Sequence, residues 1–319
     1  MDTFLTQLSF SLSVTGPICL MLFLGILFKR VGFVDDHFIG IASKLVFKVS
    51  LPALLFFSIV QADHDLSKSA DLVIFGISGN FLFFLVSGWL IRYLVPNQAN
   101  HGVVLQGGYR SNAAIIALAY VVNAYGAEGM AKAALYVGML TTLYNIEAVF
   151  ALRTKSQNDS FIASTTKLIH GIVTNPLILA IAAGYIVSLS GLHLPEVVSK
   201  AGHYFANMTL PLALICSGGA LSLRSLSQER NDAWIATFLK LVACPILLTF
   251  SGFLYGFRGL DLGILFLTSS SPTAAASYVM ARAMGKNAEL AANIIVLTTL
   301  ISLVTSTVGI FLLSYWHLI

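Results

Sequence analysis

Two clusters of polar and helix-breaking residues interrupt apolar stretches of the chain and are suited to bind a ligand. One cluster covers residues 107–113 and contains two glycines and Arg110; the other covers 268–273 and contains Pro272. Proline removes a backbone donor and glycine weakens a helix, so each cluster predicts a break in a helix. A half-helix that starts after such a break presents free N–H donors and partial positive charge. The chemistry expected where the two breaks meet is therefore anion binding.

Arg110 is the residue that makes this prediction specific. It lies nine residues into an apolar stretch, where a lone charge inside a bilayer costs several kcal/mol. A planar guanidinium suits bidentate contact with a carboxylate, so we expect Arg110 to bind an anionic substrate. Two alternatives stay open: the side chain snorkels to the membrane interface, or it pairs permanently with Glu147, the one carboxylate deep in an apolar stretch.

The polar side chains beside the two breaks can cap the half-helices or hydrogen-bond a ligand directly. We expect the substrate-binding residues to be Arg110, Ser111, Asn112, Ser270, Ser271, Pro272 and Thr273. The candidates for coupling or charge pairing are Glu147, Asn145, Lys48 and Asp71. For Asn145 the alternative is a hydrogen bond between packed helices, for Lys48 a snorkelling side chain, and for Asp71 a helix N-cap.

Other reactive or metal-binding residue types in the sequence do not form a recognisable catalytic or metal-binding motif. Lys240 is expected to snorkel, and the three cysteines lie in apolar runs, where a thiol acts as a small hydrophobe. The sequence has no metal-spaced histidines, no phosphate-binding glycine loop and no nucleophile–base pair. We therefore expect no metal, no cofactor and no enzyme activity.

The composition places these residues in a membrane protein. Of 319 residues, 57% are hydrophobic and 10% are charged, whereas soluble domains carry about 25% charged residues. A chain with so few charges cannot solvate the surface of a soluble enzyme, a secreted disulfide scaffold or a nucleic-acid binder, so these classes are excluded.

The apolar stretches predict an all-α polytopic membrane protein with ten transmembrane helices. About 20 helical residues cross a bilayer core of about 30 Å, and long continuous apolar runs do not show the alternation of a transmembrane barrel. The expected spans are 4–28, 38–60, 70–94, 101–124, 129–152, 168–190, 196–220, 232–256, 260–284 and 288–315.

The basic residues predict the orientation of these spans. The connections on one side hold ten Lys and Arg, and those on the other side hold four. The richer side is expected to be cytoplasmic, which puts both termini on the opposite, periplasmic side. The ten residues are Lys29, Arg30, Arg92, Arg153, Lys155, Lys167, Arg224, Arg230, Arg282 and Lys286.

An internal repeat divides the chain into two halves, 1–159 and 160–319. A shift of 159 residues superimposes two pairs among the 8 prolines, where about 0.1 pair is expected by chance. Each half holds five spans, an odd number, so the halves insert in opposite orientations. Inverted repeats are typical of secondary transporters, whose site lies at the midplane between interrupted helices. The alternative is a duplicated bundle without transport activity. The repeat aligns Pro17 with Pro176, Gly25 with Gly184, and Pro52 with Pro211.

Six motifs follow one another along the chain at 25–32, 44–47, 51–56, 107–112, 210–214 and 271–285. In this order they resemble the bacterial branch of the auxin efflux carrier family, which is associated with malonate and other small organic acids.

The resemblance implies a fold similar to that of sodium/proton antiporters, with two inverted five-helix repeats and crossed, broken fourth and ninth helices. It places Asn112, Ser271 and Pro272 at the crossovers. The first, second, sixth and seventh helices (about 4–60 and 168–220) are expected to form a scaffold that dimerises. The remaining helices (about 70–152 and 232–315) are expected to form a transport domain in a bacterial inner membrane. Plant members have a proline where this chain has Arg110, and a long central loop that it lacks, which favours a small carboxylate over auxin.

Three classes of function follow. The leading hypothesis is a secondary carrier of a small organic carboxylate, malonate-like or auxin-like, working as a uniporter or coupled to a proton or sodium ion. The alternative is a cation/proton antiporter of the same architecture, which requires an essential acid at the crossover; Glu147 lies on the following helix instead. A membrane-embedded enzyme or a sensor scaffold requires a catalytic dyad or a soluble output domain, and neither is found.

Overall fold

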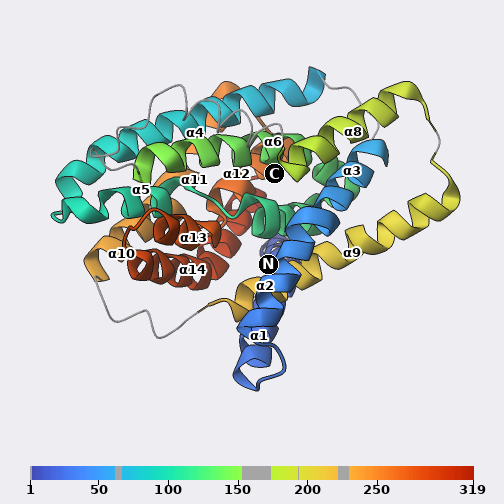
Figure 1. The fold of residues 1–319 in the computed structure, drawn as a ribbon. Helices are drawn as coiled ribbons and strands as arrows, with labels where there is room; N and C mark the ends of the chain where they lie inside the picture. Colours follow the sequence, from blue (N-terminus) through green and yellow to red (C-terminus); the bar gives the residue numbers. More distant parts are fainter. Residues whose placement is uncertain (1, 62–66, 153–173, 193, 222–229) are drawn as a thin grey trace.

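The computed structural model describes residues 2–61, 67–152, 174–192, 194–221 and 230–319, and these form a bundle of helices (Figure 1). Within these ranges there is no β-strand, only one isolated bridge between Ser111 and Thr273. The prediction of an all-helical polytopic protein is confirmed for this part of the chain.

The described part of the first half contains six α-helices with two π-helical turns among them. The turn Val46–Ser50 joins two helices and ends two residues before Pro52, whose ring cannot fit a regular turn, and the turn Ala113–Ala117 opens α6. The helices are α1 (Asp2–Arg30), α2 (Asp36–Leu45), α3 (Leu51–Gln61), α4 (Ser67–Leu94), α5 (His101–Tyr109) and α6 (Leu118–Leu152).

The second half repeats this pattern of long and interrupted helices. A π-helical turn, Leu239–Ala243, joins α10 to α11 and ends two residues before Pro245. The helices are α8 (Pro176–Ser190), α9 (Glu196–Gly219), α10 (Arg230–Phe238), α11 (Cys244–Tyr255), α12 (Gly259–Ser270), α13 (Ala276–Ala283) and α14 (Ala288–Tyr315).

Six helical stretches of the described chain are long and apolar enough to cross a membrane. The expected spans 101–124 and 260–284 are each divided at the predicted break, into α5 and the start of α6, and into α12 and α13. Residues 168–173 of the expected sixth span lie outside the described part. The six stretches are Phe4–Arg30, Asp36–Gln61, Ala70–Leu94, Ala113–Leu152, Asn231–Tyr255 and Ala288–Tyr315.

The expected connection between the fourth and fifth spans coincides with a kink that divides α6 into two helical parts. Gly126 there has φ 61° and ψ −146°, a conformation that residues with a side chain rarely adopt. The glycine therefore redirects the chain within a segment that otherwise remains helical.

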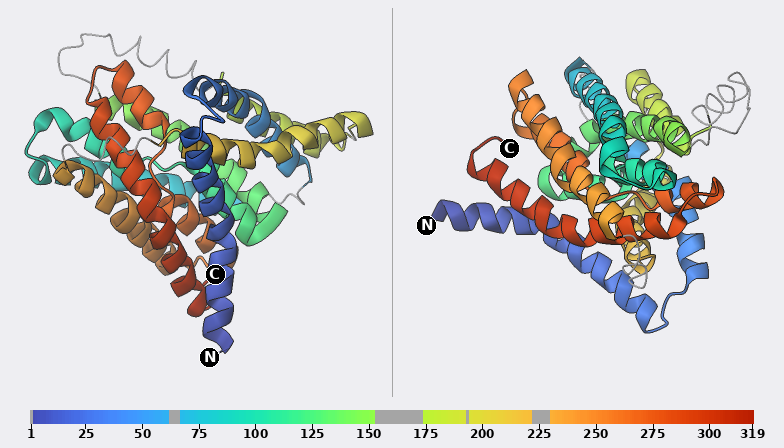
Figure 2. Two further views of the ribbon diagram at one scale, coloured as in Figure 1. Left: turned by 90° about the horizontal axis from the view of Figure 1, so that it is seen from below. Right: turned by 90° about the vertical axis from the view of Figure 1, so that its left-hand side faces the viewer.

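Both ends of the chain lie at the same end of the bundle. α1 and α14 run side by side (Figure 2), joined by a 2.8 Å hydrogen bond between the Thr15 and Thr307 hydroxyls. The rings of Phe4 and Phe311 also meet edge to face, with centroids 5.1 Å apart. A chain that crosses a membrane an even number of times has both of its termini on the same side.

Which membrane face the termini occupy stays a prediction. Of the basic residues counted for orientation, Lys29 forms a 2.5 Å ion pair with Asp36 near the end of α1. The side chains of Arg153, Lys155, Lys167, Arg224 and Arg230 lie outside the described part of the structure.

Glycine allows a close backbone contact between α1 and α9. A methyl group at Gly25 would overlap the Ile215 carbonyl, and one at Gly218 would overlap the Leu22 carbonyl. Small residues that let backbones touch are the usual means of packing helices in a membrane, where lipid is as apolar as a side chain. The α1–α9 pair is therefore fixed by shape.

We expect Gly25→Ala to lower the free energy of unfolding by about 1–3 kcal/mol, because the added methyl group forces α1 away from α9. Thermal unfolding of the purified protein measures this. Gly16→Ala is the matched control on the same helix, since a methyl group there meets nothing within 4 Å. Equal melting temperatures for the two variants would show that the α1–α9 contact at Gly25 does not contribute to stability.

Candidate functional site

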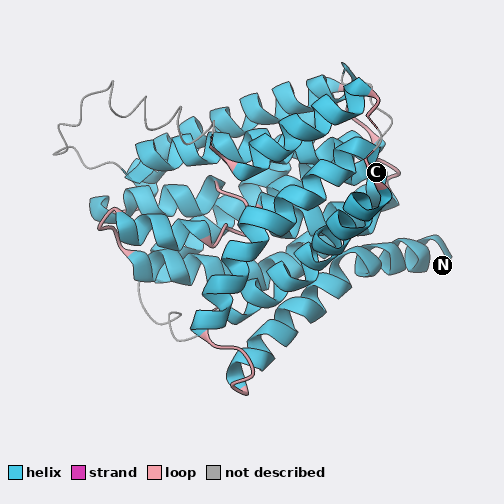
Figure 3. Ribbon diagram, turned by 45° about the vertical axis from the view of Figure 1, so that its right-hand side comes forward, coloured by secondary structure: helices cyan, strands magenta, loops and turns pink. Residues whose placement is uncertain are grey.

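Two helices end inside the bundle, at the residues where breaks are predicted. α5 ends at Tyr109 and is followed by extended backbone at Arg110 (φ −79°, ψ 99°) before the turn Ala113–Ala117. α12 ends at Ser270, and Ser271 is likewise extended (φ −65°, ψ 149°). Figure 3 shows short loop segments in the middle of the bundle as well as at its edges.

The two interruptions cross each other and are joined by their backbones. Ser111 and Thr273 form an antiparallel bridge. The Asn112 N–H donates to the Pro272 carbonyl over 2.7 Å, and the Ala274 N–H donates to the Arg110 carbonyl over 3.1 Å. Non-helical backbone at membrane depth must find partners inside the protein, and each interruption provides partners for the other.

Thr273 attaches this crossing to the surrounding helices. Its hydroxyl donates to the Gly107 carbonyl of α5 over 2.6 Å, and its N–H donates to the Thr298 hydroxyl of α14 over 3.1 Å. Thr273 is 1% exposed. It therefore connects both broken helices to α14.

The carbonyls at the end of α12 are satisfied by side chains. The Ser271 hydroxyl donates to the Thr268 carbonyl over 3.0 Å, and the Ser306 hydroxyl donates to the Ser270 carbonyl over 3.2 Å. Between them, the Lys240 ammonium donates to the Ser269 carbonyl over 2.5 Å. The prediction that Lys240 snorkels is wrong, because its ammonium finds a partner inside the protein and the residue is 0% exposed.

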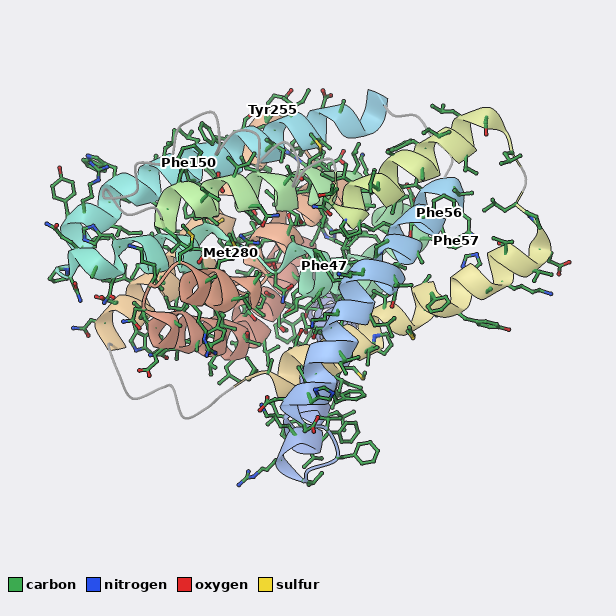
Figure 4. All side chains as sticks on the ribbon, in the orientation of Figure 1. Phe47, Phe56, Phe57, Phe150, Tyr255 and Met280 are labelled. Atoms are coloured by element: carbon green, nitrogen blue, oxygen red, sulfur yellow. The ribbon has the colours of Figure 1, made fainter. Side chains whose placement is uncertain are left out.

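Arg110 points into the protein and is 5% exposed, which excludes snorkelling. Its guanidinium donates to the Tyr144 carbonyl over 3.1 Å, to the Asn145 amide oxygen over 2.8 Å and to the Met280 sulfur over 3.2 Å. Met280 lies on α13 (Figure 4). These partners are all neutral, so they hold the guanidinium in place without cancelling its charge.

Glu147 does not pair with Arg110. It lies on α6, is 1% exposed, and both of its carboxyl oxygens lack a hydrogen-bond partner. The permanent Arg110–Glu147 pair, one of the alternatives for Arg110, is therefore absent. The Glu147 carboxyl is therefore a buried polar group without a hydrogen-bond partner in this structure, an arrangement that is rare in proteins.

Several other buried polar atoms around the crossing also lack a partner. Buried polar groups in proteins nearly always have one, so such atoms indicate a place for water or a ligand. Two of the residues, Gln106 and Ser277, were missed by the sequence analysis, although each is a polar residue within about one helical turn of a predicted break. The atoms are Arg110 Nε, Gln106 Oε1 and the hydroxyls of Ser111, Ser270 and Ser277.

Lys48 and Asp71 do not join the crossing. Both side chains are exposed. Asp71 lies inside α4, which begins at Ser67, so the N-cap interpretation is wrong. Asn145 is brought to the site as the partner of Arg110. Within the described chain, no group of three His, Cys, Asp or Glu residues could hold a metal ion.

Comparison with known proteins identifies a transport family. A profile for membrane transport proteins matches residues 14–310. An uncharacterized transporter of Methanothermobacter thermautotrophicus is 23% identical over 292 residues, covering 90% of this chain and 93% of the relative. An uncharacterized transporter of Methanocaldococcus jannaschii is 21% identical over 303 residues, with the same coverage of each chain.

Thr273→Val is expected to lower the free energy of unfolding by about 1–3 kcal/mol, because the buried Gly107 carbonyl loses the hydroxyl that bonds it. Thermal unfolding is again the measurement.

Thr237→Val is its control. Thr237 is also buried, but its hydroxyl bonds only the Ala233 carbonyl of its own helix, so a change of about 0.5 kcal/mol is expected. If the two variants lose the same stability, the Thr273 hydroxyl does not tie the crossing together.

Proposed function

The chain belongs to the membrane transport protein family, which is the auxin efflux carrier family that its motifs resemble, and we propose that it carries a small organic carboxylate across the membrane by alternating access. The family is a class of transporters, not of enzymes. Its match across the chain and the six apolar stretches make this an integral membrane protein.

The buried charge of Arg110, whose hydrogen-bond partners are all neutral, is the observation that carries the proposal. A lone cation deep in a protein and a bilayer is unfavourable unless an anion accompanies it. The guanidinium has only neutral partners in the described structure, and its Nε has none. A carboxylate matches the Arg110 guanidinium in charge and shape, because the two groups form paired hydrogen bonds.

The other site residues divide into two roles in this proposal. The hydroxyls of Ser111 and Ser270 lack partners and lie at the two breaks, so they are free to bond the substrate. The backbones of Asn112 and Pro272 and the side chains of Ser271 and Thr273 are already bonded and shape the crossing.

The proposed architecture is ten helices in two inverted repeats, 1–159 and 160–319. The offset of 159 residues superimposes Ser111 on Ser270 and Asn112 on Ser271, so the two interruptions occupy equivalent positions. It also superimposes Gly25 on Gly184. Gly25 packs α1 against the backbone of α9, and a methyl group at Gly184 would come within 3.1 Å of the Phe56 carbonyl of α3.

In the proposed transport cycle, the crossing and its neighbouring helices move against the scaffold. The scaffold consists of α1–α3, α8 and α9, and it is proposed to dimerise in a bacterial inner membrane with both termini in the periplasm. The hydrogen bonds between α5, α12 and α14 support the movement of these helices as one unit.

Glu147 is the proposed carrier of a coupling proton. Its buried, unpartnered carboxyl is suited to gain and lose a proton as the substrate's charge arrives at and leaves the site. The same residue is the basis of the alternative, a cation/proton antiporter. The two functions differ in whether proton movement requires the carboxylate.

Arg110→Gln is expected to reduce carboxylate uptake at least about 10-fold, since a charged hydrogen bond contributes about 1.5–3 kcal/mol. Uptake into proteoliposomes is measured for a panel of small mono- and dicarboxylates that includes malonate. Arg92→Gln, an exposed arginine at the end of α4, is the control and is expected to keep uptake unchanged. Full uptake by a folded Arg110→Gln protein would remove the basis of the proposal.

Glu147→Gln distinguishes the carrier from the antiporter. For the carrier, the wild-type protein dissipates a pH gradient in proteoliposomes only when the carboxylate is present, and Glu147→Gln abolishes that proton movement. The measurement is the fluorescence of a pH-sensitive dye enclosed in the vesicles. Proton movement driven by a cation alone, and lost in the same variant, would establish the antiporter instead.

A further inference from the structure

Lys240 is the buried charge that the proposed function leaves unused. It is 0% exposed and lies in the π-helical turn Leu239–Ala243, which ends two residues before Pro245. Proline cannot donate to the carbonyl of Leu241, four residues earlier, and the wider turn is the usual response of a helix to such a gap. Within the described chain Lys240 forms no ion pair with a carboxylate.

The partner of Lys240 is the end of a broken helix. Its ammonium donates to the Ser269 carbonyl, one residue before the end of α12. The last carbonyls of a helix lack helical donors and carry partial negative charge. In transporters with broken helices, such ends are places where a coupling cation is coordinated.

The carbonyls on either side of Ser269 are occupied by hydroxyl groups, those of Ser271 and Ser306. The end of α5 differs, because its carbonyls accept from neutral donors. The Gly107 carbonyl accepts from the Thr273 hydroxyl, and the Gln106 carbonyl accepts from the backbone N–H of Arg110. Of the two helix ends at the crossing, α12 is the one whose carbonyls hold an ammonium.

We propose that the Lys240 ammonium is a resident cation: it occupies the place at the end of α12 that a free monovalent cation such as sodium would take. The helix end is thereby satisfied in every turnover without an ion from solution. The site of a cation is thus present in the fold but filled by the chain itself. The ion-binding part of this inference is independent of which anion is carried.

The test is thermal unfolding of the purified full-length protein in sodium chloride and in choline chloride at equal concentration. Choline is too large to enter a carbonyl site, so it controls for ionic strength. The wild-type protein is expected to unfold at the same temperature in both salts. Lys240→Ala is expected to unfold at a lower temperature in choline, and sodium or methylammonium is expected to raise that temperature by at least about 3 °C.

Two matched variants complete this experiment. Lys44→Ala removes an exposed lysine and is expected to show neither destabilisation nor a response to sodium. Lys240→Met fills the space without a charge, so it is expected to be destabilised and to gain nothing from sodium.

Three results of the unfolding experiment would overturn the inference. The first is saturable stabilisation of the wild-type protein by sodium, which can be measured even if Lys240→Ala does not fold. The second is a Lys240→Met protein as stable as the wild type. The third is a folded Lys240→Ala protein that neither sodium nor methylammonium stabilises.

Uptake of a carboxylate extends the test and rests on the proposed function. Wild-type uptake is expected to be equal with sodium or choline on both sides of the vesicle membrane, and Lys240→Ala is expected to recover activity only in sodium. If no carboxylate is taken up at all, the proposed function fails while the unfolding result still decides the role of Lys240. A Lys240→Ala protein with weakened carboxylate uptake in both salts would make Lys240 a substrate contact and overturn the inference.

Discussion

The need to satisfy backbone hydrogen bonds away from water is the constraint on which this structure depends. A broken helix exposes N–H and C=O groups that lipid cannot bond. Here two breaks are placed against each other, so that Asn112 bonds Pro272 and Ala274 bonds Arg110 through the main chain. The serine and threonine hydroxyls around the crossing, together with Lys240, bond the carbonyls that remain. A polar site can exist at this depth because its own backbone is already satisfied.

The charges of the site follow from the same constraint. Arg110 and Lys240 are both buried, and both donate to neutral groups, but their surroundings differ. Lys240 bonds the end of α12, whose dipole favours a cation, whereas Arg110 is held by Tyr144 and Asn145 and retains an unpartnered N–H. One charge is therefore stabilised by the fold, and the other is left for a ligand.

The sequence was most informative where residue type alone decides the backbone. Glycines and Pro272 predicted where α5 and α12 end, and apolar length predicted most helix bounds within a few residues. It was least informative where a side chain depends on a distant partner. Lys240 looked like a snorkelling residue because its acceptor, the Ser269 carbonyl, is 29 residues away, and the sequence does not reveal that the two residues meet. Asp71 was misjudged as a cap because the polar residues before it also continue α4.

The contacts of α1 with α14 and α6 affect how easily these helices can move relative to one another. Thr15 bonds Thr307 of α14, and the Val14 carbonyl accepts from Asn123 of α6 over 2.9 Å. The Ser314 hydroxyl of α14 also donates to the Gln7 amide oxygen of α1. Each of these bonds has to break and form again when the helices change register, so they contribute to the barrier to that displacement.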